Sequence, residues 1–527
     1  MQVKIVSTSD VHGYVRADDF RRPLLNDSLG LTKAATAIKQ IETTSAADDI
    51  ILKIENGDFI QGSPLTNYIE KVAPDQTGIY RKLANTIGYD VRIIGNHEFN
   101  YGRDYLEKVL GDDQTILNAN IIDTITGEPF IGRPYAIFER QGVKIGVIGL
   151  TTKYIAHWEH PSHIQNLAFL DPVELAAKYI SELRDQVDII VLAYHGGFAE
   201  DLVTGAPLER LTSENQGYQL LQLPGVDALV TGHQHRKIAT VAHNVATTQP
   251  GYRGDNIGVI SLELDGKQQI IKRDARLEPT GVYPEMDSVA QVIAPLQTAV
   301  DAWLDKPVGH VGDNMQISQH FLARLQSHPF VELVNRVQMA ATGTHIANTA
   351  LFNDEVRGLQ NAVTLRDIMT NYIYPNTLVV EALTGQDIWD ALNQNGRYFV
   401  KNAAGELAIN EKFIEPKVQH YNYDIWSGVE YTFDFSRPFG DYVTTVTIDG
   451  QPIDLTATYE VTMNNYRAGG AGNFNMFASA KIVREVQIET SELIGDYIMQ
   501  HPAIQIDQPK NITAVGYEHI KQTLLTD

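Results

Sequence analysis

The fold of this chain is decided by Ile50-Ile-Leu-Lys-Ile-Glu-Asn-Gly-Asp58 and Val91-Arg-Ile-Ile-Gly-Asn-His-Glu98. Each stretch begins with an apolar run of strand length and continues through a glycine into polar side chains. Three further apolar runs end in the same way: Val3–Val6 before Asp10 and His12, Ile189–Ala193 before His195, and Asp227–Val230 before His233 and His235. In layered α/β sheets, binding groups gather beyond the strand ends, so we expect these side chains to share one pocket.

The alternation of strand-like and helix-like segments continues to about residue 275 and predicts a layered α/β domain. Helical spacing of apolar residues is clear over 172–183, and a further helix is expected from Tyr283 to about Leu304. A chain of 527 residues exceeds what one hydrophobic core usually organises. We therefore predict an N-terminal domain over 1–282, a helical linker over 283–327 and a C-terminal domain over 328–527.

The C-terminal part predicts an α+β domain, because helices mix there with paired strands. The expected helices are Phe330–Met339 and Gly385–Leu392. A strand over Tyr442–Ile448 is joined to the next run at Asp449-Gly450, a strong hairpin signal because both turn residues tolerate positive φ. No internal repeat or low-complexity segment is evident.

Charge and composition exclude some partners and chemistries. The chain has 42 Lys and Arg against 65 Asp and Glu, a net charge of −23, so we expect no nucleic-acid duplex as a partner. A small phosphate ester is compatible with this charge, because bound divalent cations reverse the electrostatics of an acidic pocket. The absence of cysteine excludes disulfides, thiolate metal ligands and a cysteine nucleophile.

The first predicted strand begins directly after Met1-Gln2, which leaves no room for a signal peptide, and no run of 18 apolar residues predicts a membrane span. We therefore expect the chain as given to be cytoplasmic and not inserted in a membrane. Removal of a signal peptide would leave the same sequence, so an extracellular or cell-surface location is the alternative. The sequence does not decide the oligomeric state.

The side chains at the strand ends suit two divalent metal ions. A carboxylate such as Asp58 can bind one ion with each oxygen. Asp10 and His12 are expected on an extended segment and can face one ion if the strand ends between them. Mixed nitrogen and oxygen ligands favour manganese, zinc, iron or cobalt over calcium. The remaining candidate ligands are Asn96, His195, His233 and His235.

Each of these residues also has an ordinary structural explanation. Gly57-Asp58 alone could form a turn, Asn96 alone could cap a helix, and a single histidine after a strand is more often a hydrogen-bonded core or surface residue. The joint pattern of five groups after five strands is what indicates a metal site, because a motif gains weight from its predicted context.

Together, these motifs resemble the signature of the calcineurin-like metallophosphoesterases, and the downstream region resembles the C-terminal domain of the 5′-nucleotidase family. The resemblance covers nearly the whole chain and implies a four-layer α/β/β/α metallophosphoesterase domain followed by an α+β 5′-nucleotidase-type domain. Asn56–Leu65 and Gly95–Gly102 are most similar to the bacterial 2′,3′-cyclic-nucleotide 2′-phosphodiesterase/3′-nucleotidase branch. Classical 5′-nucleotidases typically have Asp where this chain has Asn100. The amide of Asn100 therefore replaces a carboxylate that would orient His97 and favour its charged form.

The resemblance also implies roles for individual residues. One ion would be held by Asp10, His12, Asp58 and His235, and the other by Asp58, Asn96, His195 and His233. His97 would be the catalytic imidazole, Asn100 would orient it by a neutral hydrogen bond, and Asn96 would also contact substrate. Chemistry agrees: a metal-bound hydroxide attacks phosphorus in line, and a nearby imidazolium stabilises charge or protonates the leaving oxygen.

The segments Tyr421–Gly428 and Asn464–Gly470 resemble the two family segments that place a base between aromatic rings. Alignment of the glycines favours Tyr423 with Tyr466, and Tyr421 is the alternative. Arg357 resembles an arginine that contacts phosphate or ribose, although the glycine-rich spacing before it is shortened. With 24 tyrosines in the chain, packing in the core or on the surface is the competing explanation for any one pair.

The leading hypothesis is a metal-dependent hydrolase of 2′,3′-cyclic nucleotides and nucleoside monophosphates. A second enzyme hypothesis keeps the metal centre and changes the substrate to a 5′-nucleotide, a nucleotide sugar or a dinucleotide. The third is a nucleotide-binding or adhesion module with a vestigial metal site, and the complete ligand set together with His97 argues against it. Because the metal residues precede the proposed base-binding residues by nearly 200 positions, we expect both domains to be needed for cleavage of a nucleotide.

Overall fold

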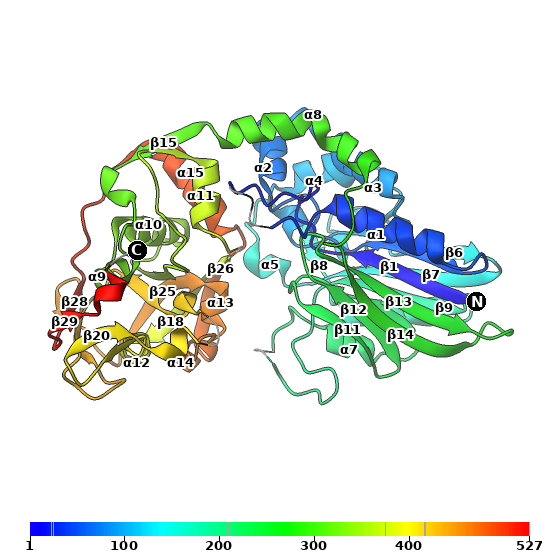
Figure 1. Cartoon of the computed structure of the whole chain (residues 1–527). Helices are drawn as coiled ribbons and strands as arrows, with labels where there is room; N and C mark the ends of the chain where they lie inside the picture. Colours follow the sequence, from blue (N-terminus) through cyan, green and yellow to red (C-terminus); the bar gives the residue numbers. More distant parts are fainter. Residues whose placement is uncertain (23, 25, 209–210, 375, 416–417, 526–527) are drawn as a thin grey trace. The chain divides into compact units, whose positions relative to one another are not determined.

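The computed structural model divides the chain into two compact units, unit 1 over Met1–Trp303 and unit 2 over Leu304–Asp527 (Figure 1). It describes all residues except 23, 25, 209–210, 375, 416–417 and 526–527, together with the side chain of residue 158. The division lies within the predicted linker of 283–327. Residues 307–327 are nevertheless folded into unit 2, because strand β15 (Pro307–Val311) pairs with two other strands and Phe321 is buried in the core of that unit.

Unit 1 contains two six-stranded sheets. The first has the order β14-β13-β1-β2-β3-β4, with β1 (Gln2–Thr8), β2 (Ile50–Glu55), β3 (Val91–Ile93), β4 (Ile116–Leu117), β13 (Asn256–Leu264) and β14 (Ile270–Pro279). The second has the order β11-β12-β10-β9-β7-β6, with β6 (Tyr135–Arg140), β7 (Val143–Thr151), β9 (Ile189–His195), β10 (Ala228–Val230), β11 (Lys237–Ala242) and β12 (Val245–Pro250). A separate pair is formed by β5 (Ile121–Asp123) and β8 (Leu167–Phe169).

The two sheets pack against each other, and helices cover them. Ile5 of the first sheet and Val191 of the second belong to one buried cluster. On the opposite face of β9, Ile190 and Leu192 pack with helix residues such as Ile180. Because β9 is buried on both faces, its apolar run has no polar alternation. The helices of unit 1 are α1 (Leu31–Thr44), α2 (Pro64–Lys71), α3 (Gly78–Ile87), α4 (Arg103–Leu110), α5 (Ile155–Trp158), α6 (Pro172–Leu183), α7 (Gly217–Leu221) and α8 (Asp287–Leu304).

The predicted strands and helices of unit 1 are present. Helix α6 covers the predicted range because Asp171 caps it, accepting from the backbone amides of Val173 and Glu174, and Pro172 occupies its first turn. Helix α8 begins at Asp287, four residues after the predicted Tyr283. Its Trp303 ring lies 5.7 Å from the ring of Tyr68 on α2, which anchors the helix to unit 1.

Unit 2 is α+β, as expected. Its sheets have the orders β21-β16-β25-β18-β26, β24-β23-β22-β28, β17-β15-β27 and β19-β20-β29. The strands are β15, β16 (Ile346–Ala350), β17 (Ala362–Thr364), β18 (Leu378–Thr384), β19 (Phe399–Lys401), β20 (Glu406–Ile409), β21 (Asp424–Ser427), β22 (Glu430–Asp434), β23 (Val443–Ile448), β24 (Gln451–Pro452), β25 (Thr458–Asn464), β26 (Lys481–Val486), β27 (Ala503–Ile504), β28 (Ile512–Val515) and β29 (His519–Ile520). The helices are α9 (His320–Gln326), α10 (Pro329–Thr342), α11 (Leu365–Asn371), α12 (Gly385–Gly396), α13 (Asn465–Ala468), α14 (Asn475–Ala478) and α15 (Thr490–Gln500).

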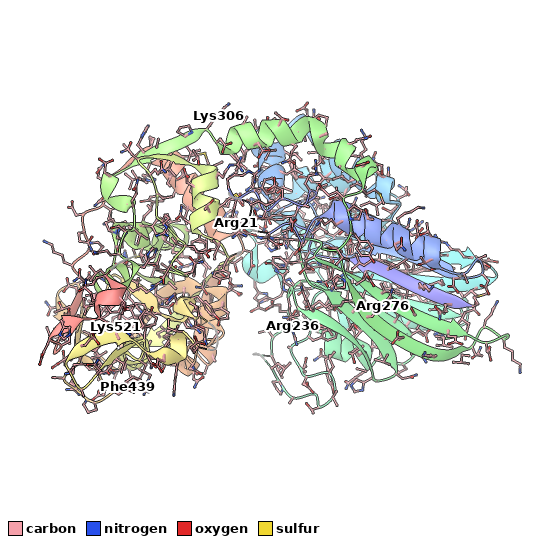
Figure 2. All side chains as sticks on the ribbon, viewed as in Figure 1. Arg21, Arg236, Arg276, Lys306, Phe439 and Lys521 are labelled. Atoms are coloured by element: carbon pink, nitrogen blue, oxygen red, sulfur yellow. The ribbon has the colours of Figure 1, made fainter. Side chains whose placement is uncertain are left out.

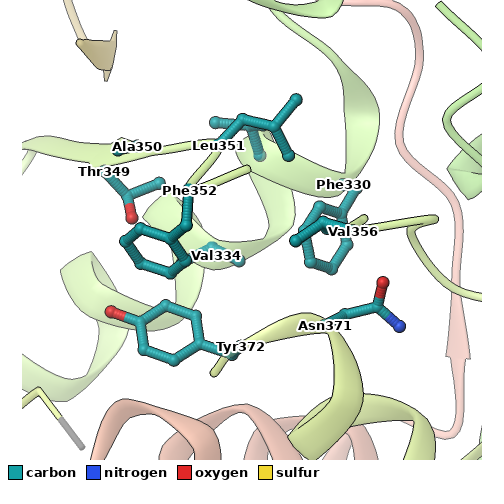
Figure 3. Close-up of a pocket in the computed structure, with 10 residues that line it drawn as sticks. Phe330, Val334, Thr349, Ala350, Leu351, Phe352, Val356, Asn371 and Tyr372 are labelled. Atoms are coloured by element: carbon teal, nitrogen blue, oxygen red, sulfur yellow. The ribbon is translucent and has the colours of Figure 1, made fainter. Parts of the chain in front are cut away.

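The predicted hairpin of unit 2 is formed by β23 and β24, and its turn residues Asp449 and Gly450 have φ of 51° and 71°. An enclosed cavity beside α10, lined by residues such as Phe330, Phe352 and Tyr372, has a volume of only 10 Å³ (Figure 3). That volume holds at most about one water, so this cavity is not a nucleotide site. Among the described residues, no helix has the length and apolar character needed to cross a membrane.

Candidate metal centre

The predicted ligands come together beyond the strand ends of unit 1. Strands β1, β2 and β3 run parallel in one sheet, and β9 and β10 run parallel in the other, so the residues that follow them meet at one edge. Two groups of side chains have ligand atoms within 4.8 Å of one another: Asp10, His12 and His235, and Asp58, His195 and His233. The Oδ1 atom of Asn96 lies 2.8 Å from Nδ1 of His233 and 3.2 Å from Nε2 of His195.

Most of these residues adopt the left-handed backbone region. The φ angles are 55° for Asp10, 51° for His12, 57° for Asp58, 71° for His233 and 55° for His235. The expectation of an extended segment from Asp10 to His12 is therefore wrong. Strand β1 has already ended, and this loop is held by backbone hydrogen bonds to Gly57 and Asp58 (3.0 and 2.8 Å). Each such conformation costs about 1–3 kcal/mol and is typical of functional sites.

Glu98 and Gly57 fix the loop that carries Asp58. The Glu98 carboxylate is buried and accepts from the backbone amides of Asp58 (2.9 Å), Phe59 (2.7 Å) and Gly95 (2.7 Å). Gly57 has a φ of 89°, and a Cβ atom there would lie 2.6 Å from Nδ1 of His195. A side chain at position 57 would thus displace a candidate ligand, which explains the glycine before Asp58.

In three histidines, one ring nitrogen forms a hydrogen bond outside the ligand groups, and the other ring nitrogen is thereby directed into the site. Nδ1 of His195 is 2.6 Å from the carbonyl of Asn56, and Nδ1 of His12 is 3.0 Å from the carbonyl of Gln61. A carbonyl only accepts, so each Nδ1 carries a hydrogen, and in the neutral ring each Nε2 presents a lone pair. Nε2 of His233 pairs with Glu214 (2.9 Å), so its Nδ1 faces Asn96.

The converging atoms fit a divalent cation. Nε2 of His195 faces Oδ2 of Asp58 (3.1 Å), an oxygen that is buried without a hydrogen-bond partner, and Nε2 of His12 lies 3.0 Å from Nε2 of His235. A hydrogen on one atom of each pair satisfies such a contact, and a divalent cation can replace that hydrogen because both atoms of each pair can offer lone pairs. Outer hydrogen bonds to histidine ligands are a regular feature of metal sites.

The electrostatics of the site point to the same conclusion. Burial acts to raise the pKa of Asp58, but His195 and His97 hold it well below its usual value. Burial acts to lower the pKa of His195, whereas the Asp58 carboxylate raises it to about 10. Burial lowers the pKa of His12 to about 3. The site thus attracts one positive charge at His195 and keeps His12 neutral, and a divalent cation competes with the proton for these atoms.

His97 lies beside the two ligand groups and belongs to neither. Its backbone amide donates to Oδ1 of Asp58 (2.8 Å), and its ring is 5.0 Å from the ring of His12. Nδ1 of His97 is 2.7 Å from Oδ1 of Asn100, and Nδ2 of Asn100 donates to Glu159 (2.8 Å). This arrangement is compatible with the role implied for His97 outside the metal ligands, with Asn100 as its hydrogen-bond partner.

The predicted aromatic residues of unit 2 are only partly brought together. Tyr423 is completely buried, and its hydroxyl donates to the backbone carbonyl of Arg324 (3.0 Å). The favoured pairing of Tyr423 with Tyr466 is therefore wrong, because a ring buried in the core cannot stack on a base. The alternative, Tyr421, is in ring contact with Tyr466, with centroids 6.3 Å apart and an interplanar angle of 73°. Tyr466 is 46% exposed.

A buried ion pair connects the two aromatic segments of unit 2. The Arg467 guanidinium donates to Asp424 (2.6 and 3.2 Å), to the carbonyl of Tyr421 (3.0 Å) and to the carbonyl of Ala471. Arg467 follows Tyr466 directly in the sequence, so it fixes the loop of one tyrosine to the backbone of the other. The sequence alone did not suggest this role.

Arg357, the third predicted contact of unit 2, is exposed. Its backbone amide donates to Oδ1 of Asn371 (2.9 Å), and its backbone carbonyl accepts from the amide of Ile317 (2.9 Å). These bonds fix the backbone and leave the predicted role of the guanidinium as a proposal.

Several residues of the metal centre were missed at the sequence level because their contacts are long-range. Glu214 lies in an irregular stretch before α7, and Glu159 ends α5, so neither follows a strand. Arg236, labelled in Figure 2, directly follows His235. Its guanidinium donates to the carbonyl of Phe198 (3.2 Å), which ties the His233–His235 loop to the segment after β9. Only Glu98 carried a signal, since it lies within the Gly95–Glu98 motif.

Comparisons with known proteins agree with this geometry. The family described as calcineurin-like phosphoesterase matches residues 3–237, and the 5′-nucleotidase C-terminal domain matches residues 307–479. A 2′,3′-cyclic-nucleotide 2′-phosphodiesterase/3′-nucleotidase of Salmonella typhimurium is 30% identical over 546 residues, which cover 89% of this chain and 82% of that protein. A 5′-nucleotidase of Vibrio vulnificus is 23% identical, with 96% and 92% of the two chains covered.

The fold is also found in a solved structure. A Staphylococcus aureus protein provisionally named a 5′-nucleotidase, crystallised with α-ketoglutarate, superposes with a TM-score of 0.72 at 34% identity. The match covers 98% of this chain and 100% of that protein. Both predicted domains are therefore present in one known two-domain architecture.

Proposed function

Because the chain belongs to the calcineurin-like phosphoesterases that carry a 5′-nucleotidase C-terminal domain, we propose that it is a 2′,3′-cyclic-nucleotide 2′-phosphodiesterase with 3′-nucleotidase activity. The family consists of phosphoester hydrolases that depend on divalent metal ions. The observation that carries the proposal is the presence of two groups of side chains that could each hold a metal ion, with His97 beside them; the groups are Asp10, His12, His235 and Asp58, His195, His233.

We assign one ion to Asp10, His12, Asp58 and His235, and the other to Asp58, Asn96, His195 and His233. When bound, the two ions supply Lewis acidity that polarises phosphoryl oxygens and lowers the pKa of water. The mixture of imidazole nitrogens with carboxylate and amide oxygens suits manganese, zinc, iron or cobalt. Glu214 and the carbonyls of Asn56 and Gln61 would keep the histidine ligands in the tautomers that present lone pairs to the ions.

His97 is assigned to the leaving oxygen. With Nδ1 bonded to Asn100, its Nε2 is the nitrogen available to hold a proton near the substrate. Opening of a 2′,3′-cyclic diester at the 2′ position releases a ribose alkoxide, and hydrolysis of the resulting 3′-monoester releases another. Both leaving groups need a proton, so one imidazole at one phosphate site can serve the two steps in succession.

We assign recognition of the base to Tyr421 and Tyr466 of unit 2. Every nucleobase has two π faces, so a pair of aromatic rings tolerates purines and pyrimidines alike. The rings stand edge to face in this structure, so stacking on both faces of a base requires one ring to turn. Arg357 is the proposed contact to phosphate or ribose. The substrate is thus a small nucleotide, and a nucleic-acid duplex is not part of the proposal.

The test is a panel of initial rates for the manganese-loaded protein on 2′,3′-cyclic AMP, 3′-AMP, 5′-AMP, a nucleotide sugar, a dinucleotide and bis-p-nitrophenyl phosphate. The proposal expects the first two nucleotides to be preferred over 5′-AMP, and chelation to abolish all rates. A preference for 5′-AMP would instead favour the 5′-nucleotidase alternative. Fastest hydrolysis of the nucleotide sugar or the dinucleotide would favour the alternative in which that compound is the substrate. Binding without hydrolysis of any substrate would support the non-enzymatic alternative.

A further inference from the structure

Glu159 is a buried carboxylate that forms a hydrogen bond with Asn100, the partner of His97. Its side chain is 7% exposed and lies at the end of α5, far in sequence from the ligand motifs. Oε2 accepts from Nδ2 of Asn100 (2.8 Å), and Oε1 faces Nδ1 of His163 (2.7 Å) and accepts from the backbone amide of His160 (2.9 Å). Donors therefore occupy both oxygens.

These contacts determine which way the Asn100 amide faces. A carboxylate only accepts hydrogen bonds, so the NH₂ group of Asn100 must point to Glu159. The amide oxygen then points to His97, and at 2.7 Å the hydrogen of that bond must be on Nδ1 of His97. Nε2 of His97 is consequently the nitrogen directed to chemistry. The orientation of Asn100 is thus determined by Glu159 and not by Asn100 itself.

We propose that Glu159 is a positioning residue that acts through Asn100 to fix the tautomer and orientation of the His97 imidazole. The inference rests on the proposed function in assigning the leaving oxygen to His97. It also accounts for the departure at position 100, where the resemblance led us to expect a carboxylate beside His97. The carboxylate is still present in this series of hydrogen bonds, but it belongs to Glu159 and contacts Asn100 instead of His97.

The proposal makes a specific prediction for Glu159→Gln. The backbone amide of His160 requires an acceptor, so the glutamine oxygen takes the Oε1 position and its NH₂ group faces Asn100. Asn100 then turns its oxygen to Gln at position 159 and its NH₂ group to His97. Nδ1 of His97 must become the acceptor, and the single hydrogen of the neutral ring moves to Nε2. Nδ1 of His97 can then no longer donate to Asn100. The ring that must supply a proton from Nε2 loses the acceptor that stabilises its protonated form, although every residue remains hydrogen-bonded.

The second variant, Asn100→Asp, places two carboxylates next to each other, which is unfavourable. In the double variant Asn100→Asp/Glu159→Gln, the aspartate accepts both from Nδ1 of His97 and from the glutamine NH₂ group. Each donor then faces an acceptor again, and Nδ1 of His97 again donates to the side chain at position 100. Each single change should therefore impair the enzyme, and the combination should recover most of the loss. A purely structural role of Glu159 predicts no such recovery.

The experiment measures kcat and KM for the wild type, both single variants and the double variant, with metal content by elemental analysis. The substrate is whichever of 2′,3′-cyclic AMP, 3′-AMP and 5′-AMP the wild type hydrolyses fastest, because each releases a ribose alkoxide that needs a proton. We expect Glu159→Gln to lower kcat by about 10–100-fold, the usual scale for a lost supporting hydrogen bond, with KM and both ions retained. The matched control is Glu107→Gln on α4, an exposed carboxylate paired with Arg103 (2.8 Å), which should behave as the wild type.

A wild-type kcat for Glu159→Gln, or loss of the ions from it, would overturn the proposal. A double variant no faster than the single variants would also overturn it. If Glu159→Gln alone does not fold, the comparison of Asn100→Asp with the double variant carries the test, since the double must be faster. The choice among three nucleotides keeps this test separate from the proposed function: absence of cyclic-nucleotide hydrolysis would refute that function while the recovery is still measurable on 5′-AMP.

Discussion

Replacement of Tyr466 by alanine tests the proposed base recognition, because this ring is 46% exposed and little of the fold depends on it. Its hydroxyl lies 3.4 Å from Oδ1 of Asn422, and the guanidinium of Arg467 lies 5.7 Å from the ring centroid. A stacked base contributes about 1–3 kcal/mol. Since half of the ring is already covered, we expect the lower part of that range, about 1–2 kcal/mol or a 5- to 30-fold loss of kcat/KM.

The assay compares kcat/KM of Tyr466→Ala on 2′,3′-cyclic AMP and on bis-p-nitrophenyl phosphate, which has no nucleobase. The loss should appear in KM for the nucleotide and be nearly absent for the aryl diester. The control is Tyr423→Phe, which removes the buried hydroxyl that donates to Arg324. It should lower the free energy of unfolding by about 1–3 kcal/mol and leave KM unchanged. Equal losses of Tyr466→Ala on both substrates would refute a role in base recognition.

Three further predictions concern the metal centre and the core of unit 2. Asp58→Asn should abolish turnover and lower the metal content found by elemental analysis; two retained ions with near-normal rates would contradict the shared ligand. His97→Asn should lower kcat by about 10²–10⁴-fold, with both ions retained, and loss of the ions would disprove its place outside the ligands. Arg467→Met should destabilise unit 2 by about 3–5 kcal/mol in urea denaturation, because Asp424 stays buried without its partner; addition of Asp424→Asn should recover part of this loss, and no change in stability would contradict the reasoning.

The sequence predicted the position of a candidate metal ligand well where that residue directly follows a strand. Apolar runs such as Ile189–Ala193 predict buried strands, and strands in layered sheets bring their following residues to one edge. The positions of Asp10, Asp58 and His233 could therefore be inferred without coordinates. Their left-handed backbone could not, because aspartate and histidine visit that region only when surrounding hydrogen bonds hold them there.

Sequence reasoning was weaker where packing decides which residue faces solvent. Tyr421 and Tyr423 are two positions apart, and the glycine spacing favoured the wrong one. The ring of Tyr423 is packed by Tyr398 (4.8 Å) and Phe399 (5.2 Å), residues whose proximity depends on the fold of the whole unit. Likewise, Glu159 reaches Asn100 across 59 positions, and no local pattern signals that contact.

The most direct test of the proposed activity is a ³¹P NMR time course of 2′,3′-cyclic AMP with the manganese-loaded protein. The account predicts that the cyclic diester signal is replaced first by 3′-AMP and then by inorganic phosphate, with neither change in the presence of a chelator. Accumulation of 2′-AMP, or an unchanged cyclic signal under conditions in which 5′-AMP is hydrolysed, would contradict it.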